Sequence, residues 1–145
     1  MKVLSMIQPW ASLLVLGETK YETRSWKTKY RGPLAIHASQ KTDKQVCRHE
    51  LVIAKLAKHG YSAEMLPNGV IMATCQLTNC YQVIENSGTS AILDEGQVVS
   101  GVDYLFGDYD TGYYAWEIKD RQILSAFIPA KGKLGLWEYI SEGSE

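Results

Sequence analysis

Apolar residues in this chain gather in short runs separated by turn-forming residues, a pattern that predicts strands. The runs at residues 2–7, 34–38, 69–77 and 113–118 each have the length of a strand. A last run within residues 129–140 contains glycines that fit bulges or tight curvature. We therefore expect a sheet of short strands, with the run at 34–38 ending in a Ser-Gln-Lys loop.

Two segments have spacings typical of helices instead. Residues 9–16 begin with Pro9 at a favourable first helical position and end before Gly17, which can adopt the left-handed conformation that ends a helix. Residues 42–59 begin with a Thr-x-x-Gln capping box and carry apolar residues three and four positions apart. Short strands separated by two helices predict an α+β fold, a small mixed β-barrel with two or three helices on its rim.

The segment 17–31 combines charge, aromatic side chains and strand-like alternation. In an extended conformation, alternation places Lys20, Glu22, Arg24 and Trp26 on one face. An Arg and carboxylate pair beside a Trp suits a base or nucleotide, because Arg can stack as well as donate and an aromatic ring accepts any base. The alternative is an edge strand whose charged face is solvated and self-paired.

Two further side chains are candidates for structural or functional roles. Trp10, beside the Gln8-Pro9 turn, is either a core residue or part of a pocket wall. His37 lies at the end of the strand expected at 34–38, and we expect it to be a hydrogen-bonded structural residue.

The length of 145 residues with 46% apolar composition suits one compact domain, which we expect to span residues 1–145. Residues 84–112 are acidic and contain several glycines, so we expect an irregular acidic insertion there, with one short helix around residues 90–94. A segment of this length inside a compact domain is often a lid or a binding loop.

The net charge of -1 hides a division between two parts of the chain. Residues 1–60 hold eleven Lys and Arg and four Asp and Glu, whereas residues 61–145 hold four and twelve. The first part could therefore present a positive surface to a polyanion. Alternatively, the two parts pair with each other in the folded protein.

Cysteine, glycine and hydropathy patterns indicate no metal, no cofactor and no membrane segment. Cys47-x-His49 and Cys75-x4-Cys80 lack the spacing of zinc fingers and ribbons. Neither a Walker loop, a dinucleotide fingerprint nor a Gly-x-Ser-x-Gly elbow is present. The apolar runs are shorter than a membrane span, and the beginning of the chain does not have the form of a signal peptide. We expect a cytoplasmic protein with free thiols.

Three early segments carry distinctive motifs. They are SMIQPWASLLV at residues 5–15, the stretch 17–26 with its Glu-x-Arg-Ser-Trp ending, and YRGPLAIHA at residues 30–38. Together these segments resemble the ASCH domain family. The later segments YAW at 114–116 and KGKLGLW at 131–137 are similar to the last strands of the family. The resemblance implies a PUA-like β-barrel, a cleft between barrel and helices, and binding of RNA or other nucleic acid. The family that the chain resembles also includes small amidohydrolases, which deacetylate acetylcytidine with a Lys, a Thr and a Glu. Ribonuclease activity has been proposed for other members.

The family motif reads Gly-x-Lys-x-x-Glu-x-Arg, with Thr in place of Glu in the amidohydrolases, and this chain departs from the hydrolase pattern. Thr19 stands at the Lys position, and Lys20 comes one residue later, which in a strand turns the side chain to the opposite face. Glu22 stands at the hydrolase Thr position. Gln76 falls at the hydrolase Glu position, and Gln cannot accept a proton as Glu does. Binding is therefore favoured over hydrolysis.

We predict a basic, aromatic-lined cleft that binds RNA, another nucleic acid or a modified nucleoside. The expected binding residues are Gln8, Pro9, Trp10, Lys20, Glu22, Arg24, Ser25, Trp26, Gln76, Lys131 and Lys133. The alternative is a small amidohydrolase acting on acetylcytidine or a similar acylated nucleoside, with Lys20 and Glu22 as base and acid; ribonuclease activity is less favoured. A third possibility is a protein-interaction module with a flat apolar patch.

Overall fold

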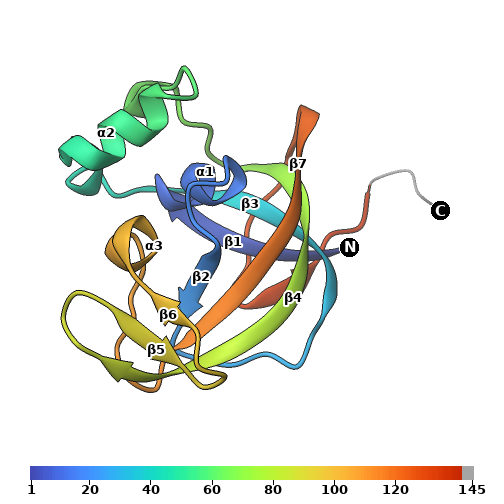
Figure 1. Cartoon of the computed structure of the whole chain (residues 1–145). Helices are drawn as coiled ribbons and strands as arrows, with labels where there is room; N and C mark the ends of the chain where they lie inside the picture. Colours follow the sequence, from blue (N-terminus) through green and yellow to red (C-terminus); the bar gives the residue numbers. More distant parts are fainter. Residues whose placement is uncertain (142–145) are drawn as a thin grey trace.

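The computed structural model of the protein describes residues 1–141 and shows a curved sheet with short helices beside it (Figure 1). The strands are β1 (Lys2–Gln8), β2 (Tyr21–Arg24), β3 (Gly32–Thr42), β4 (Val70–Asn86), β5 (Ala91–Leu93), β6 (Val98–Val99), β7 (Tyr114–Pro129) and β8 (Leu136–Glu138). The α-helices are α1 (Trp10–Val15), α2 (Glu50–Ala57) and α3 (Gly101–Leu105), and Val46–Arg48 and Ala63–Met65 form 3₁₀ turns.

The main sheet has the strand order β2-β7-β4-β3-β1-β8, and β5 and β6 extend it from one end of β4. β1 and β3 are parallel, and the other pairs are antiparallel. β2 and β8 end the path, and no strand pair joins them within residues 1–141. The predicted mixed α+β class is confirmed, whereas these pairings do not close the sheet into a barrel.

The edge of β1 that faces away from β3 is only partly covered by another strand. β8 pairs with its first three residues, Lys2 to Leu4, and goes no further. The rest of this edge faces β2, which does not pair with it. An opening is therefore left beside the second half of β1.

Apolar side chains cover both faces of β1, β3 and β4. Leu4, Ile36 and Trp116 lie in the main core, whereas Val3 and Trp137 belong to a second cluster. Burial on both faces explains why these strands read as nearly continuous apolar runs instead of alternating ones.

The predicted helix at residues 9–16 is confirmed as α1. Gln8 is fully buried, and its Oε1 accepts from the backbone N–H of Ser12 at 3.0 Å while its Nε2 donates to the Pro67 carbonyl at 2.9 Å. Gly17 ends the helix with a φ of +84°, a conformation that favours glycine. The Gln8 side chain is thus engaged in holding the start of α1.

The single helix predicted at residues 42–59 is wrong. β3 continues through Thr42, which pairs with Gln8, so the expected loop after residue 38 is also wrong. His49 is extended and interrupts the helical path after a 3₁₀ turn. Its Nδ1 then accepts from the backbone N–H of Leu51 at 3.2 Å, which caps α2.

Residues 84–112 are more regular than predicted, and the helix expected near residues 90–94 is wrong. Ala91 and Leu93 are buried and Ile92 is less so, an alternation that suits strand β5. The helix of this segment is α3. These elements pack around a separate cluster that includes Tyr81 and Tyr109. The assignment of residues 1–145 to one domain stays a prediction.

Two of the cysteines are core residues. Burial raises the pKa of the Cys47 thiol, and it raises that of Cys75 to about 11. Across residues 1–141 no three His, Cys, Asp or Glu side chains are grouped as metal ligands would be, and none of the helices is long and apolar enough to cross a membrane.

Candidate functional site

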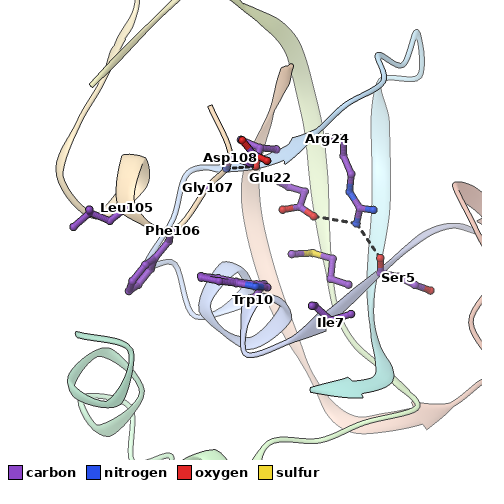
Figure 2. Close-up of a pocket in the computed structure, with 11 residues that line it drawn as sticks. Ser5, Ile7, Trp10, Glu22, Arg24, Leu105, Phe106, Gly107 and Asp108 are labelled. Atoms are coloured by element: carbon purple, nitrogen blue, oxygen red, sulfur yellow. Dashed lines mark hydrogen bonds and ion pairs between the residues drawn. The ribbon is translucent and has the colours of Figure 1, made fainter. Parts of the chain in front are cut away.

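A pocket of about 470 Å³ lies beside the unpaired half of β1 (Figure 2). β1 contributes residues 5–7, and the other walls come from α1, β2 and the end of α3 with the loop that follows. The side chains that define its chemistry are Trp10, Glu22, Arg24, Leu105, Phe106 and Asp108.

Glu22 and Arg24 form a partly buried ion pair on one wall. They stand two residues apart on β2, so both side chains point to the same face. Arg24 Nη2 lies 3.0 Å from Glu22 Oε2 and also donates to the Ser5 carbonyl at 2.9 Å. The Arg24 side chain is 24% exposed, and the Glu22 side chain is 17% exposed. Burial raises the pKa of Glu22, and the neighbouring guanidinium offsets only part of this effect.

The guanidinium of Arg24 is not fully used by the protein. Its Nε is buried and has no hydrogen-bond acceptor within residues 1–141. Buried polar groups are almost always hydrogen-bonded, so this unsatisfied donor calls for an explanation. A ligand that draws the guanidinium into the pocket would provide one.

Two aromatic rings form the opposite wall. Trp10 is the first residue of α1, and Phe106 directly follows α3. The ring centroids are 5.7 Å apart at an interplanar angle of 62°, an edge-to-face arrangement. Trp10 remains partly exposed while it packs against two core clusters. Both interpretations of Trp10 therefore hold, since it is at once a core residue and a pocket wall.

The loop after α3 completes the pocket. The backbone N–H of Asp108 donates to Thr23 Oγ1 at 2.8 Å, which fastens this loop to β2. A Cβ at Gly107 would lie 2.5 Å from the ring of Tyr109, so glycine is needed for the close approach. Burial also raises the pKa of Asp108.

The charge of the pocket differs from the prediction. Its charged side chains are the carboxylates of Glu22 and Asp108 and the guanidinium of Arg24. The rings of Trp10 and Phe106 line this pocket, but it is not basic, because the lysines expected in the cleft lie elsewhere.

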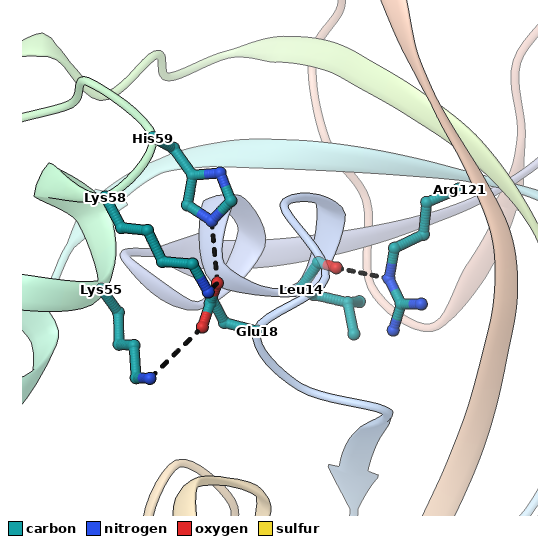
Figure 3. A network of polar contacts seen from close by, with 6 residues as sticks. All are labelled: Leu14, Glu18, Lys55, Lys58, His59 and Arg121. Atoms are coloured by element: carbon teal, nitrogen blue, oxygen red, sulfur yellow. Dashed lines mark hydrogen bonds and ion pairs between the residues drawn. The ribbon is translucent and has the colours of Figure 1, made fainter.

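A charged network attaches α2 to the chain that leads from α1 into β2 (Figure 3). Glu18 Oε2 accepts from His59 Nε2 at 2.8 Å and from Lys58 Nζ at 3.1 Å, and Lys55 Nζ lies 3.7 Å from Oε1. The Glu18 side chain is only 8% exposed. The hydrogen bond from His59, aided by the two lysines, lowers the pKa of Glu18.

Arg121 of β7 fastens the same connection from the other side (Figure 3). Its Nε donates to the Leu14 carbonyl at 2.5 Å, and its Nη2 donates to the Thr19 carbonyl. Because Leu14 belongs to α1 and Thr19 precedes β2, these bonds fix the elements that carry Trp10 and Glu22.

Trp10, Glu22 and Arg24 are the predicted residues that the structure brings together with their side chains. Lys20 is exposed and does not line this pocket, so it does not converge there with Glu22. Trp26 packs on Trp116 of the core, with centroids 4.8 Å apart. The role of each predicted site residue stays a prediction.

The remaining predicted residues lie in other places. Gln8 and Pro9 are buried at the start of α1, and Ser25 is exposed just beyond β2. Gln76 borders a different hollow on β4 and β7. Lys131 and Lys133 border yet another hollow, near β8.

Sequence reasoning missed the pocket residues that the segment 84–112 contributes, namely Leu105, Phe106, Gly107 and Asp108, and also Ser5, Met6, Ile7 and Thr23. The segment 84–112 was predicted as an irregular acidic insertion of a length that often forms a lid or a binding loop. An aromatic residue followed by glycine and an acid was the available signal, but its meaning depends on contacts with α1 and β2 that the sequence does not reveal.

A family model and two curated proteins are similar to this chain. The model of the family described as ASCH domain matches residues 4–127. Activating signal cointegrator 1 of Mus musculus is 39% identical over 142 residues, which cover 96% of this chain and 22% of the mouse protein. Activating signal cointegrator 1 of Homo sapiens is 38% identical over 80 residues, which cover 53% of this chain and 14% of the human protein. The chain thus spans about a fifth or less of the length of these curated relatives.

Proposed function

This chain belongs to the ASCH domain family, and we propose that it binds single-stranded RNA by holding one base in the pocket beside β1. The observation that carries the proposal is the partly buried Glu22 and Arg24 pair, which faces the rings of Trp10 and Phe106 across a space of about 470 Å³. Sequence-specific recognition of RNA commonly uses unstacked bases that are stacked on aromatic rings and hydrogen-bonded at their edges.

The charge of the pocket favours a base over a phosphate. With both acids ionised, two carboxylates and one guanidinium give the lining a net negative charge, which repels a phosphate group. The carboxylate of Glu22 can accept from an exocyclic amino group, and Arg24 can donate to a ring nitrogen or carbonyl. We therefore expect cytosine and adenine to be preferred over uracil.

The test compares short cytidine and uridine oligonucleotides by fluorescence anisotropy. Arg24→Ala is expected to weaken cytidine binding about tenfold or more, equivalent to roughly 1.4 kcal/mol. Glu22→Gln is expected to reduce the preference for cytidine over uridine. Lys41→Ala removes one exposed positive charge outside the pocket and serves as the control. Equal binding by wild type and Arg24→Ala would exclude this site.

Hydrolysis of acetylcytidine is the second proposal, and Glu22 with its raised pKa is the group that would take part in proton transfer. Lys20 lies outside the pocket, which makes this proposal the weaker one. Release of the acetyl group by wild type and its loss in Glu22→Gln would favour the enzyme.

We also propose that the curved sheet is a PUA-like barrel. Its support is the contact of Arg24 with the Ser5 carbonyl, which bridges β2 and β1 where strand pairing is missing. A cytoplasmic location likewise remains a proposal.

A further inference from the structure

A second hollow, of about 460 Å³, lies where the loop after β2 packs against β4 and β7. Lys27, Lys29 and Arg31 line it, and all three are exposed. Within residues 1–141, none of these cations forms an ion pair with a carboxylate.

The loop that carries these cations is held in place. Arg31 Nη1 donates to the carbonyls of Thr28 and Tyr30 at 2.9 and 2.8 Å, and Thr28 Oγ1 accepts from the Tyr30 backbone N–H at 3.1 Å. Trp26 rests on Trp116, whose Nε1 donates to the Trp26 carbonyl at 3.4 Å. The backbone that carries these cations is thus fixed before binding, so less conformational entropy is lost when a ligand binds.

The balance of charge in the second hollow is opposite to that of the first pocket. Asp94 is the one acid in its lining, against three cations. Gln82 Nε2 and the Tyr114 hydroxyl, 3.5 Å apart, add groups that can donate hydrogen bonds from the sheet. This set suits a phosphate oxygen, whereas the first pocket suits a base.

Strand register brings the two hollows close together. Arg24 pairs with Tyr114, and Tyr114 pairs with Gln82, so the three residues form one row across β2, β7 and β4. Residues directly opposite each other in a sheet point to the same face, and adjacent strands lie about 4.8 Å apart. The row from Arg24 to Gln82 therefore covers only about 10 Å.

We propose that the second hollow binds a backbone phosphate of the same RNA strand whose base occupies the first pocket, an inference that rests on the proposed function. The strand would leave the base pocket at Arg24, cross the exposed Ser25 and reach the cations of the loop. Ligands longer than one nucleoside then make interactions that a nucleoside cannot make, and the resulting increase in affinity depends on salt.

The experiment combines Lys27→Gln, Lys29→Gln and Arg31→Gln in one variant. Its matched control combines Lys2→Gln, Lys44→Gln and Lys119→Gln, which removes the same charge from surface lysines outside both hollows. Binding of cytidine and of a short cytidine oligonucleotide is measured over a range of salt concentrations.

We expect the loop variant to bind the oligonucleotide at least about tenfold more weakly at low salt. Its plot of log affinity against log salt should become shallower by roughly 0.7 for each phosphate that the variant no longer neutralises. Affinity for cytidine should stay unchanged, and the control should behave as wild type. Circular dichroism verifies folding, and Lys29→Gln alone, with a smaller effect of the same kind, replaces the triple variant if that variant does not fold.

The outcomes separate the two proposals. An unchanged salt slope in the loop variant, with oligonucleotide binding still weakened by Arg24→Ala, overturns the phosphate site and leaves the base pocket standing. Failure of wild type to bind cytidine and oligonucleotide overturns both. Displacement of the oligonucleotide by polyglutamate in wild type, with no effect of RNA length on affinity, would point instead to an acidic protein partner.

Discussion

The edge of β1 that faces away from β3 has two halves with different neighbours. β8 pairs with the closed half, residues 2–4, whereas the open half, residues 5–7, lines the candidate site. Along Lys2 to Leu4, β8 pairs with the edge, and Trp137 buries its ring opposite Val3. Beyond Leu4 the edge meets the Arg24 side chain instead of a strand. A strand edge left without a partner offers unpaired backbone groups. Side chains from β2 and α1 surround this half, and the candidate site lies there.

Ser5 stands at the boundary between the halves. Its Oγ accepts from Trp137 Nε1 at 3.0 Å and lies 2.9 Å from His37 Nδ1, to which it can donate. His37 Nε2 then lies 2.7 Å from the Ala130 carbonyl, the arrangement in which it donates. His37 is thus a hydrogen-bonded structural residue, as predicted. The closed half depends on this buried network, whereas in the open half the Arg24 side chain bridges β2 and β1 through the Ser5 carbonyl.

The largest effect should come from breaking the closed half. Trp137→Ala removes a buried ring and the hydrogen bond to Ser5, and we expect it to lower the free energy of unfolding by about 3–5 kcal/mol. Urea denaturation measures this change, and Trp137→Phe, which keeps most of the ring, should lose less. A loss below about 1 kcal/mol would show that the packing of β8 on this edge contributes little to the free energy of unfolding.

A smaller effect is expected from crowding the same network. A Cβ at Gly132 would lie 2.8 Å from both His37 Cε1 and Ser5 Oγ, so Gly132→Ala should destabilise the protein by about 1–3 kcal/mol. Lys133→Ala, at the next and exposed position, is the control. Equal stability of the two variants in thermal melting would mean that the network can shift without cost.

Breaking an attachment of the open half should lower the stability less, and the size of this loss should depend on pH. Glu18→Gln is expected to cost about 1 kcal/mol at neutral pH, since Lys55 and Lys58 lose a charged partner and His59 loses a charged acceptor. Because the folded protein lowers the pKa of Glu18, this contribution is present above its ordinary value of 4.5 and is lost as pH falls through the lowered value. Urea titrations from pH 7 to 3 measure the difference between variant and wild type. A difference that does not shrink in acid would contradict the assignment.

The smallest effect on stability should come from Glu22→Gln, and its pH dependence has the opposite sign. The folded protein raises the pKa of Glu22, so folding favours the protonated form. Wild type should lose stability relative to the variant as pH rises from 4.5 through the raised value, and then level off. A stability difference independent of pH would show that Glu22 is solvated, and the open half would then be less buried than the geometry indicates.

Local patterns predicted the elements that depend on local causes. The Pro9 start and Gly17 end of α1, and the apolar runs of β1 and β4, were read correctly because turn chemistry and burial act within a few residues. The break at His49 was missed, because a Thr-x-x-Gln capping signal at Thr42 competes with strand pairing to Gln8 that lies far away in the sequence.

The site was predicted in part for the same reason. Glu22 and Arg24 share a face by strand alternation, which the sequence shows. Trp26 does not line the pocket, because β2 ends at Arg24 and the Trp26 ring packs on Trp116 of β7 instead. Phe106 could not be found from the sequence, because its place beside Trp10 depends on the path of the whole segment between β4 and β7.

The pairing of β2 with β7 also determines when the site can form during synthesis. Glu22 and Arg24 pair with Trp116 and Tyr114, about ninety residues later in the chain. The ribosome adds about 5–20 residues each second, so β2 waits several seconds or more for its partner. A nascent chain that ends before residue 114 carries the residues of the site without the site itself. β2 is therefore synthesised about ninety residues before the strand that completes its side of the candidate site.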